Sequence, residues 1–419
     1  MEIINITRNS YFDAKEKYHI SYFILYLLNL FLGLIYYFLL KIISFFIKVN
    51  INFIDTNRVG HLIVDGILHA EHLKKINLRN KYYLFCANKK KICNNFFFEK
   101  LKQNLRIINI NFFLPLFILK DFLHNYNINL QISDLPLRKF KTEFFELLDN
   151  QKTFFFTAKE YEEGNTILKN NFNIIDNDKI VCIIIRDSSY LKKKDSGFEF
   201  RNYNPKNFIP AINKLIELGY YVFLMGKKNT LNLPIQHDRF IHYSNSGISS
   251  DFMDFYLAKR CSFYISTTTG IDHSAYIFNK PIGYLVISLG YIFFLRDNNF
   301  YLPSNFMNYK KEKISLQELF KAGLFFYNTK EEFEKRNILP THNTEDEITN
   351  FFLEIHNYCE KKKTELYSRR NQDMFWNKYS KLYMTSTYGK KVFKNNVFFS
   401  KSVISDYYLR KNRDWYLND

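Results

Sequence analysis

The stretch Asp251-Phe-Met-Asp254-Phe-Tyr-Leu257, followed by Ser262-Phe-Tyr-Ile-Ser266-Thr-Thr-Thr-Gly270-Ile-Asp272, decides the fold of this chain. It predicts a helix, a buried strand, a polar turn and the start of a second helix, because a short aromatic and β-branched run is typical of a buried parallel strand. Open α/β sheets bind ligands at the carboxyl ends of their strands, and a helix N-terminus favours phosphate. The turn from Ser266 to Gly270 is therefore a candidate phosphate site, and a simple Ser or Thr helix cap is the alternative.

A second segment predicts the central strand of the same sheet. Ile180-Val-Cys-Ile-Ile-Ile185 shows no alternation of apolar and polar residues, so both of its faces should be covered. Arg186 and Asp187 come directly after it, and a planar guanidinium suits a diphosphate because it donates two parallel hydrogen bonds. An Arg–Asp pair that closes a turn is the alternative. About 80 residues separate Arg186 from the Ser-Thr turn, enough for a pair of βα units, so both segments can line one nucleotide pocket.

These two segments belong to an ordered series of motifs between about residues 154 and 347. The motifs are Arg186-Asp-Ser-x-Tyr190, Arg201-Asn202, Gly219-Tyr-Tyr-Val-x-x-Met225-Gly226, Tyr243-x-Asn245-Ser-Gly247, Ser250-Asp251-Phe-Met-Asp254-x-Tyr-Leu257 and Ile265-Ser-Thr-x-x-Gly270. In this order and combination, they resemble a little-characterised bacterial family of predicted glycosyltransferases of the GT-B type. One position differs, because Leu224 precedes Met-Gly where that family more often has Arg.

A more distant resemblance concerns the donor half of the fucosyltransferases that use GDP-fucose. Arg186 after one strand, Asp254 on a helix and Ser266-Thr267 after a second strand carry it, whereas Ile184 replaces the His of the usual His-x-Arg. The resemblances imply two Rossmann-like domains that face each other across a cleft, with the donor in the carboxyl-terminal one. They also imply that Asp254 binds the base or ribose, although its helix position equally fits an exposed charge. The predicted donor-binding residues are Arg186, Asp187, Gly226, Asp254, Ser266, Thr267, Thr268, Thr269 and Gly270.

The composition is that of a folded, basic chain. Of the 419 residues 47% are hydrophobic, with 45 Phe and 31 Tyr but only 13 Gly and 8 Pro, which excludes wholesale disorder and allows two domains plus a tail. The net charge of +18 is scattered, and the sequence contains no recognised nucleic-acid motif. Attraction to anionic lipid headgroups is therefore favoured over nucleic-acid binding.

The five cysteines form no Cys-x-x-Cys pair and leave one unpaired, which indicates a reduced intracellular chain. No metal site is predicted. Asp176-Asn-Asp178 has the Asp-x-Asp form that metal-dependent glycosyltransferases use, but it precedes the central strand, away from the ligand crevice, and is interpreted as a turn. His69 and His72 share a helix face without an apparent third ligand. Walker, Gly-x-Gly-x-x-Gly and Gly-x-Ser-x-Gly motifs are absent from the sequence.

The amino-terminal region predicts a membrane anchor. Residues 22–40 are nineteen residues without a charge, and residues 42–47 continue the apolar run beyond Lys41. This length can span a hydrocarbon core. The run is too long for a signal peptide and no small-residue cleavage site follows it. A monotopic helix that lies in the interface is the alternative, and basic residues on both sides leave its orientation open.

Beyond residue 50, strands alternate with helices, which predicts two α/β units with parallel sheets. In the first unit the expected strands are 53–56, 82–86, 106–110 and 153–156, and the expected helices 62–73, 96–105 and 140–148. In the second, the strands are 180–185, 220–224, 240–243, 263–265 and 281–285, the helices 208–218 and 251–258, and Thr344-Glu-Asp-Glu347 is a capping box that opens a further helix. The predicted domains are a membrane anchor (1–50), an acceptor domain (51–175), a donor domain (176–343) and a helical tail (344–419) that packs across both domains.

A candidate general base follows the first strand of the acceptor domain. Arg58-Val-Gly60-His61 stands there, where GT-B enzymes of the heptosyltransferase kind have an Arg-x-Gly-Asp turn whose Asp acts as base. An imidazole can do the same work, since its ordinary pKa lies near neutrality, and a helix-capping histidine is the alternative. Arg58, Gly60 and Asp65 are assigned to the acceptor side, with Asp65 as the next candidate for the base.

The sequence and its resemblances together predict a metal-independent hexosyl- or deoxyhexosyltransferase at the inner membrane, with its catalytic domains in the cytoplasm. It transfers a sugar from a nucleotide-sugar donor to a membrane-associated glycan or lipid-linked acceptor in bacterial surface polysaccharide synthesis. No cofactor besides this co-substrate and no nucleic-acid partner is expected. His61 and Arg186 are the predicted catalytic residues. The alternative is a non-catalytic, membrane-bound subunit of a polysaccharide assembly complex.

Overall fold

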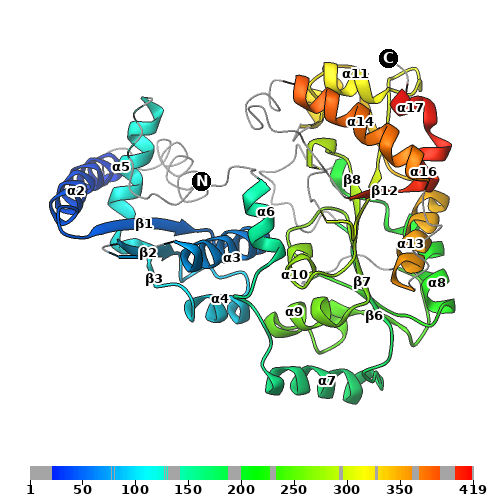
Figure 1. Ribbon diagram of the computed structural model, residues 1–419, viewed down its shortest axis with the longest axis horizontal. Coiled ribbons are helices and arrows are strands. Elements are labelled where there is room, and N and C mark those ends of the chain that lie inside the picture. The colour runs from blue at the N-terminus through cyan, green and yellow to red at the C-terminus, as the bar shows by residue number, and fades with distance from the viewer. Residues whose placement is uncertain are drawn as a thin grey trace. The chain divides into compact units, whose positions relative to one another are not determined.

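The computed structural model divides the chain into two compact units. The first is Met1–Lys139 with Asn150–Phe155, and the second is Phe140–Asp149 with Phe156–Asp419. Each unit contains a parallel sheet flanked by helices (Figure 1), so the predicted α/β class with parallel sheets is confirmed. The structure describes residues 21–76, 78–79, 81–126, 128, 130, 142–186, 200–226, 233–291, 296–325, 329–360, 368–386 and 402–417.

The first unit has a three-stranded parallel sheet in the order β1-β2-β3. A helix that the sequence analysis does not predict, α5, follows the third strand and packs against α2. In chain order the elements are α2 (Ser21–Ile43), β1 (Lys48–Ile54), α3 (Val59–Lys75), β2 (Lys81–Ala87), α4 (Asn95–Lys102), β3 (Ile107–Asn109), η1 (Ile110–Phe112) and α5 (Leu114–Asn125).

The strand predicted at residues 153–156 is wrong, because this segment is irregular and is fastened to α3 by side chains. Glu71 Oε1 accepts hydrogen bonds from Lys152 N at 2.7 Å and from Thr153 Oγ1 at 2.5 Å. Burial alone would raise the pKa of Glu71, but these hydrogen bonds and the Lys74 ammonium hold that pKa below its ordinary value. Phe154 stacks on Phe97 with 4.9 Å between ring centroids, so the β-prone residues fill a side-chain core instead of joining the sheet.

The second unit is built on a seven-stranded sheet in the order β12-β9-β8-β7-β4-β5-β6, in which all neighbours are parallel. A separate antiparallel pair joins β10 and β11. The strands are β4 (Ile180–Ile184), β5 (Tyr221–Leu224), β6 (Phe240–His242), β7 (Phe263–Ser266), β8 (Ile282–Val286), β9 (Asn299–Pro303), β10 (Asn305–Met307), β11 (Leu339–Thr341) and β12 (Val403–Ile404).

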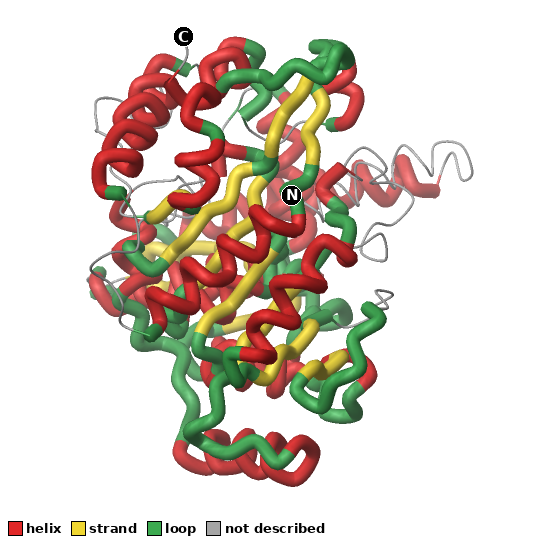
Figure 2. The backbone as a smooth tube through the Cα atoms, turned by 90° about the vertical axis from the view of Figure 1, so that its right-hand side faces the viewer, coloured by secondary structure: helices red, strands yellow, loops and turns green. Residues whose placement is uncertain are grey.

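The helices of the second unit cover both faces of this sheet. Helices α8 and α13 lie on one face, and α9 and α10 lie on the other (Figure 1). Figure 2 shows strands running side by side with helices in front of them. The helical elements are α6 (Thr142–Asp149), α7 (Ala158–Phe172), η4 (Pro205–Phe208), α8 (Ile209–Glu217), η5 (Tyr243–Asn245), α9 (Asp251–Arg260), α10 (Asp272–Ile277), η6 (Leu289–Tyr291), α11 (Leu316–Lys321), α12 (Lys330–Glu334), α13 (Glu345–Cys359), α14 (Arg369–Thr385), α16 (Asp406–Lys411) and α17 (Arg413–Leu417).

The predicted central strand is confirmed, because β4 lies between β5 and β7 and its first four residues are fully buried. The neighbouring β8 carries Gly283, where α13 comes close to the sheet. A Cβ at Gly283 would lie only 2.4 Å from Ile355 Cδ1 and 2.7 Å from Ile265 Cδ1, so these side chains would have to shift to make room for it. The glycine therefore lets the side chains of α13 pack directly on the sheet.

Residues 344–419 supply α13, α14, α16 and α17, together with the edge strand β12. Val403 and Ile404 of this strand pair with Phe300 and Tyr301 of β9. The predicted capping box is confirmed, since Glu347 N donates to Thr344 Oγ1 at 3.2 Å and Thr344 N donates back to the Glu347 carboxylate at 3.2 Å.

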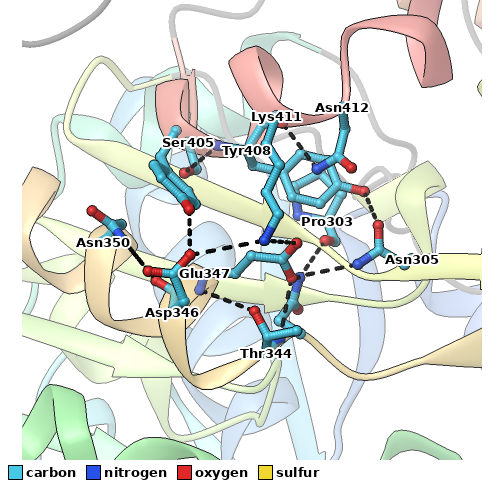
Figure 3. A network of polar contacts seen from close by, with 12 residues as sticks. Pro303, Asn305, Thr344, Asp346, Glu347, Asn350, Ser405, Tyr408, Lys411 and Asn412 are labelled. Carbon is cyan, nitrogen blue, oxygen red and sulfur yellow. Dashed lines mark hydrogen bonds and ion pairs between the residues drawn. The ribbon is translucent and has the colours of Figure 1, made fainter.

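The same Glu347 is the centre of a polar network (Figure 3). The network is buried, because only 2% of Glu347 is exposed. Its carboxylate accepts hydrogen bonds from Asn305 Nδ2 at 3.4 Å and Asn343 Nδ2 at 3.2 Å, and Lys411 Nζ lies 3.6 Å away. A buried carboxylate is tolerated only when it is hydrogen-bonded or paired. The network therefore ties the start of α13 to the β9–β10 connection and to α16.

A second carboxylate of α13, Glu354, should make stability depend on pH. It accepts a hydrogen bond from Tyr407 N at 2.7 Å. Burial is the main cause that raises the pKa of Glu354 from 4.5 to about 8, and Asp406 adds to it. The folded protein then holds a proton that the unfolded chain has lost between these two pH values. Its free energy of unfolding should therefore fall as the pH rises through this window.

The Glu354→Gln variant should remove this dependence. At pH 9 we expect it to be more stable than the natural chain by at least about 1 kcal/mol, and at pH 4 the two should unfold alike. Thermal unfolding at both pH values measures the difference. Glu345→Gln, an exposed position on the same helix, is the matched control and should change neither midpoint. Equal stability of Glu354→Gln and the natural chain at pH 9 would contradict this prediction.

Candidate functional site

The carboxyl ends of β4 and β7 bring the two predicted donor segments together. These strands are neighbours, and Ile184 pairs with Ser266 at their ends. Directly beyond that pair, Arg186 N donates to Thr267 Oγ1 at 2.8 Å, and Thr267 N donates to Ile184 O at 3.2 Å. The predicted adjacency of Arg186 and the Ser-Thr turn is therefore observed. Arg186 itself is 9% exposed.

The turn from Ser266 to Gly270 is shaped by its own hydroxyl groups. Ser266 Oγ donates to Asp272 Oδ2 at 2.6 Å and accepts from Thr269 N at 3.1 Å. Thr268 has a φ of 58°, in the left-handed region that a threonine rarely adopts, so the turn is held in an unusual conformation. Ser266 and Thr267 are buried, whereas Thr268, Thr269 and Gly270 are half-buried and reach the surface.

A second arginine, which the sequence analysis does not select as a site residue, braces this turn. Arg201 Nη2 donates to Thr268 O at 3.1 Å and lies 3.3 Å from Thr268 Oγ1. Two residues on, Tyr203 fixes the same segment, because its hydroxyl lies 3.0 Å from Ser304 Oγ and its ring centroid lies 4.4 Å from that of His342. Arg201 occurs in the Arg-Asn motif quoted above, and that motif was the available signal.

The other predicted donor residues occupy different positions around this edge. Gly226 lies two residues beyond the end of β5, and its φ is 144°. Asp187 lies outside the described residues. Asp254 is 5% exposed on α9, so it is not an exposed charge. Its Oδ1 accepts a hydrogen bond from Tyr243 Oη at 2.9 Å. Burial and the Asp254 carboxylate both raise the pKa of Tyr243, which keeps this donor protonated. Asp254 thus fastens η5, at the end of β6, to α9.

In the first unit, the predicted acceptor residues lie where β1 meets α3. Val59, Gly60 and His61 belong to the first turn of α3, so the prediction that they form a turn before the helix is wrong. The N-cap is Arg58, whose side chain makes no capping hydrogen bond, and His61 is therefore not the helix cap. Asp65 lies one helical turn further on and is half-buried.

His61 is paired with a carboxylate that the sequence analysis misses. Its Nδ1 lies 3.7 Å from Asp55 Oδ2, and the side chains are 39% and 11% exposed. Asp55 Oδ1 accepts from Asn57 N at 3.0 Å, which fixes the carboxylate at the end of β1. The 3.7 Å separation is slightly longer than a hydrogen bond, and a carboxylate beside the histidine is an arrangement found in general bases. An aspartate six residues before a histidine was the signal in the sequence, although the strand expected at 53–56 included that aspartate.

The predicted Asp-x-Asp turn is observed at the amino end of β4. Asp178 Oδ2 accepts from Ile175 N at 2.8 Å, and Arg260 contacts the carbonyl oxygens of Ile175 and Asp176. His69 contacts the ring of Phe85, with 5.2 Å between centroids. Within the described residues, no three His, Cys, Asp or Glu side chains gather to hold a metal ion.

Comparison of the sequence with protein-family models and with curated proteins finds no match. Among solved structures, the Escherichia coli ADP-heptose LPS heptosyltransferase II matches 57% of this chain and 85% of its own, with 11% identity and a TM-score of 0.35. A glycosyl transferase family 9 structure from Veillonella parvula matches 57% of this chain and 80% of its own, with 12% identity and a TM-score of 0.37. The E. coli heptosyltransferase WaaC with ADP matches 61% of this chain and 91% of its own, with 8% identity and a TM-score of 0.30.

Proposed function

We propose that this chain is a glycosyltransferase that moves a sugar from a nucleotide-sugar donor to a membrane-associated glycan or lipid-linked acceptor in bacterial surface polysaccharide synthesis. The observation that carries the proposal is the shared edge of β4 and β7, where Arg186 and Arg201 both contact the turn at Thr267 and Thr268. Carboxyl edges of parallel sheets are where nucleotides bind, and guanidinium groups suit a diphosphate. The GT-B arrangement and the resemblance to fucosyltransferases remain predictions.

The residues take separate roles in this proposal. Arg186 and Arg201 neutralise the diphosphate and stabilise it as the leaving group, beside the half-buried Thr268 to Gly270. Asp187, Gly226 and Asp254 complete the donor side, with Asp254 directed to the base or ribose. Ser266 and Thr267 act by shaping the turn, because their hydroxyl groups are engaged within it or with Arg186 N.

On the acceptor side, His61 deprotonates the attacking hydroxyl and Asp55 orients the imidazole. Arg58 and Gly60 border this position, and Asp65 is the substitute base. The anchor in α2 keeps the enzyme beside its membrane-associated acceptor, with the catalytic units on the cytoplasmic side of the inner membrane. The transfer itself uses no metal and no cofactor besides the nucleotide sugar, and the sugar is a hexose or deoxyhexose.

Replacing Arg186 by alanine tests the donor site. Loss of a charge-assisted hydrogen bond typically costs about 1.5–3 kcal/mol, so the affinity for a nucleotide diphosphate sugar should fall at least tenfold. Titration calorimetry with UDP-, GDP- and ADP-linked sugars measures it. Arg239→Ala is the matched control, because Arg239 directly precedes β6 and so lies at the opposite edge of the same sheet.

Thermal unfolding of the natural chain with the same nucleotide sugars separates the proposal from its alternative. A nucleotide sugar at 100 times its Kd should add about 2.7 kcal/mol to the stability of the natural chain. If none of the nucleotides stabilises the natural chain, the non-catalytic subunit of an assembly complex becomes the better interpretation. If a nucleotide binds and Arg186→Ala leaves its affinity unchanged, the donor site lies elsewhere.

A further inference from the structure

Helix α2 has two faces with different surroundings. Among the described residues, only Phe23–Ile43 forms a helix long and apolar enough to cross a membrane, with a mean hydropathy of 2.2. One face of this helix packs on the first unit. Leu30, Tyr36, Tyr37 and Leu40 rest on a core cluster that includes Ile51, Leu116 and Phe117. Together with Gly33, which contacts α5, the packed positions 30, 33, 37 and 40 follow the spacing of three and four residues that is typical of packed helices.

The middle of α2 is fixed to α5 by a close contact at Gly33. A Cβ at Gly33 would lie 2.5 Å from Pro115 O and 2.8 Å from Leu119 Cβ, so only glycine allows the two helices to approach this closely. Tyr36 adds an edge contact to Phe113, with 6.0 Å between ring centroids. Helix α2 is consequently an outer layer of the first unit and not a free stalk.

The opposite face of α2 is apolar and exposed. The helix has one side-chain amide, that of Asn29. Its Nδ2 donates to Leu25 O of the preceding turn at 2.7 Å, so this polar group is satisfied within the helix. Beyond the helix, Phe45 and Phe46 are 85% and 80% exposed and continue the same apolar run. The exposed apolar side chains are Phe23, Ile24, Leu25, Leu27, Leu28, Phe31, Leu32, Leu34, Ile35, Phe38, Leu39, Ile42, Ile43, Phe45, Phe46 and Ile47. A continuous apolar surface of this kind marks an interaction site.

The packing of α2 on α5 limits how the exposed face of α2 can enter a bilayer. If α2 crossed the membrane, Gly33 would lie near its centre, about 15 Å below the headgroups. Pro115 and Leu119 of α5 would lie at the same depth, because they contact Gly33. Lys120 and Asp121, the next two residues of α5, would be carried there with them. Charged groups at that depth are costly and rare. A helix parallel to the surface avoids this, because only its outer face enters the lipid.

We propose that α2 lies in the plane of the membrane, with its outer face in one leaflet of an anionic phospholipid bilayer and both of its ends on the same side. Lys41 and Lys48, at the carboxyl end of the apolar run, and the net charge of +18 favour anionic headgroups as the partner. This placement does not depend on the transfer reaction proposed above. It favours the monotopic anchor over the spanning one, two alternatives that the sequence leaves open.

Depth measurements test the proposal on the full-length chain. Ile24, Phe31 and Ile42 are all exposed, and their spacing of about two and three turns places them along one line of the helix. Each is replaced in turn by tryptophan, and quenching by brominated lipids is measured in vesicles of phosphatidylcholine and phosphatidylglycerol. An in-plane helix gives equal depths at the three positions. A spanning helix places Phe31→Trp about 10 Å deeper than the other two.

Two controls make the result decisive. Tyr36→Trp, on the packed face, should be protected from the quencher, and the natural chain gives the background of Trp376 and Trp415. The double variant Phe31→Lys/Phe38→Lys should bind vesicles at least tenfold more weakly with an unchanged unfolding midpoint, since both side chains are more than 60% exposed. Deletion of residues 1–49 is a poorer test, because it also uncovers Leu116 and Phe117 of α5.

Labelling of cysteines with a membrane-impermeant maleimide in sealed inner-membrane vesicles gives an independent readout. Ser21→Cys, at the start of α2, and Lys90→Cys, exposed in the same unit, should react from the same side. Reaction from opposite sides, unequal depths, or failure of the natural chain to bind the vesicles would each overturn the proposal. Burial of the face in a detergent-stable oligomer without vesicle binding would assign it to a second copy of the chain.

Discussion

Replacement of His61 by alanine is expected to lower the turnover of glycosyl transfer at least a hundredfold. A positioned general base usually contributes about 10²–10⁴-fold to the rate. His61 is in the first unit, 3.7 Å from Asp55, whereas the predicted donor residues belong to the second unit. The affinity for the nucleotide sugar should therefore be retained. Single-turnover transfer from a labelled donor, together with calorimetric donor binding, separates the two effects.

Two further variants sharpen this experiment. Asp55→Asn keeps the shape of the side chain but removes its charge, so turnover should fall by a smaller factor than in His61→Ala. His72→Ala, three turns further along α3, is the matched control and should leave turnover unchanged. Near-normal turnover of His61→Ala would remove His61 from the mechanism, and Asp65 would then be the base to test.

Replacement of Arg296 by methionine is expected to destabilise the second unit by about 3 kcal/mol, because it leaves the Asp149 carboxylate, whose side chain is 27% exposed, without its cationic partner. Arg296 Nε donates to Asp149 Oδ1 at 2.6 Å, and Nη2 donates to Leu148 O at 3.3 Å. The guanidinium also lies 3.9 Å from the centroid of the Tyr276 ring, and Tyr276 Oη donates to Asp149 Oδ1 at 2.7 Å. These contacts fasten α6 to the body of the second unit. The unfolding midpoint should fall by about 5–10 °C.

A double-mutant cycle identifies the cause of this loss. Arg296→Met/Asp149→Asn removes both charges, so it should be less destabilised than the sum of the two single variants. Lys214→Met is the matched control. Lys214 Nζ lies 2.8 Å from Glu217 Oε2, but both side chains are about half exposed, so this change should alter stability by less than about 1 kcal/mol. Simple additivity in the cycle would show that packing, and not the ion pair, holds α6.

Much of the architecture could be predicted from the sequence because it depends on local apolar runs. The segments that became β4 and β7 lack the alternation of a half-exposed strand, and both are buried inside the seven-stranded sheet. Since consecutive βα units place strand ends along one edge, the neighbourhood of Arg186 and Thr267 also followed from the sequence. The same rule failed at residues 153–156, where aromatic side chains are used in a core contact with Phe97 instead of a strand.

The candidate sites needed the tertiary structure, because their decisive contacts depend on where the helices begin and on which segments pack together. Arg201 reaches Thr268 across 67 positions of the chain. Asp55 meets His61 only because α3 begins at Val59, earlier than the apolar periodicity indicates. The two-residue strand β12 is too short to carry a period of its own and is recognised only by its pairing with β9.

Helix α2 shows most clearly what the sequence determines and what only the tertiary structure determines. The sequence by itself determined that residues 22–47 are apolar enough to enter a membrane, because hydropathy is a property of composition. Only the tertiary structure decided which half of that surface stays exposed. Gly33 lacks the side chain that would keep Pro115 away, so one face of α2 is occupied by α5 and the other is left exposed. Hydrophobicity alone does not distinguish the two faces of α2. Steric fit between two helices far apart in the chain does.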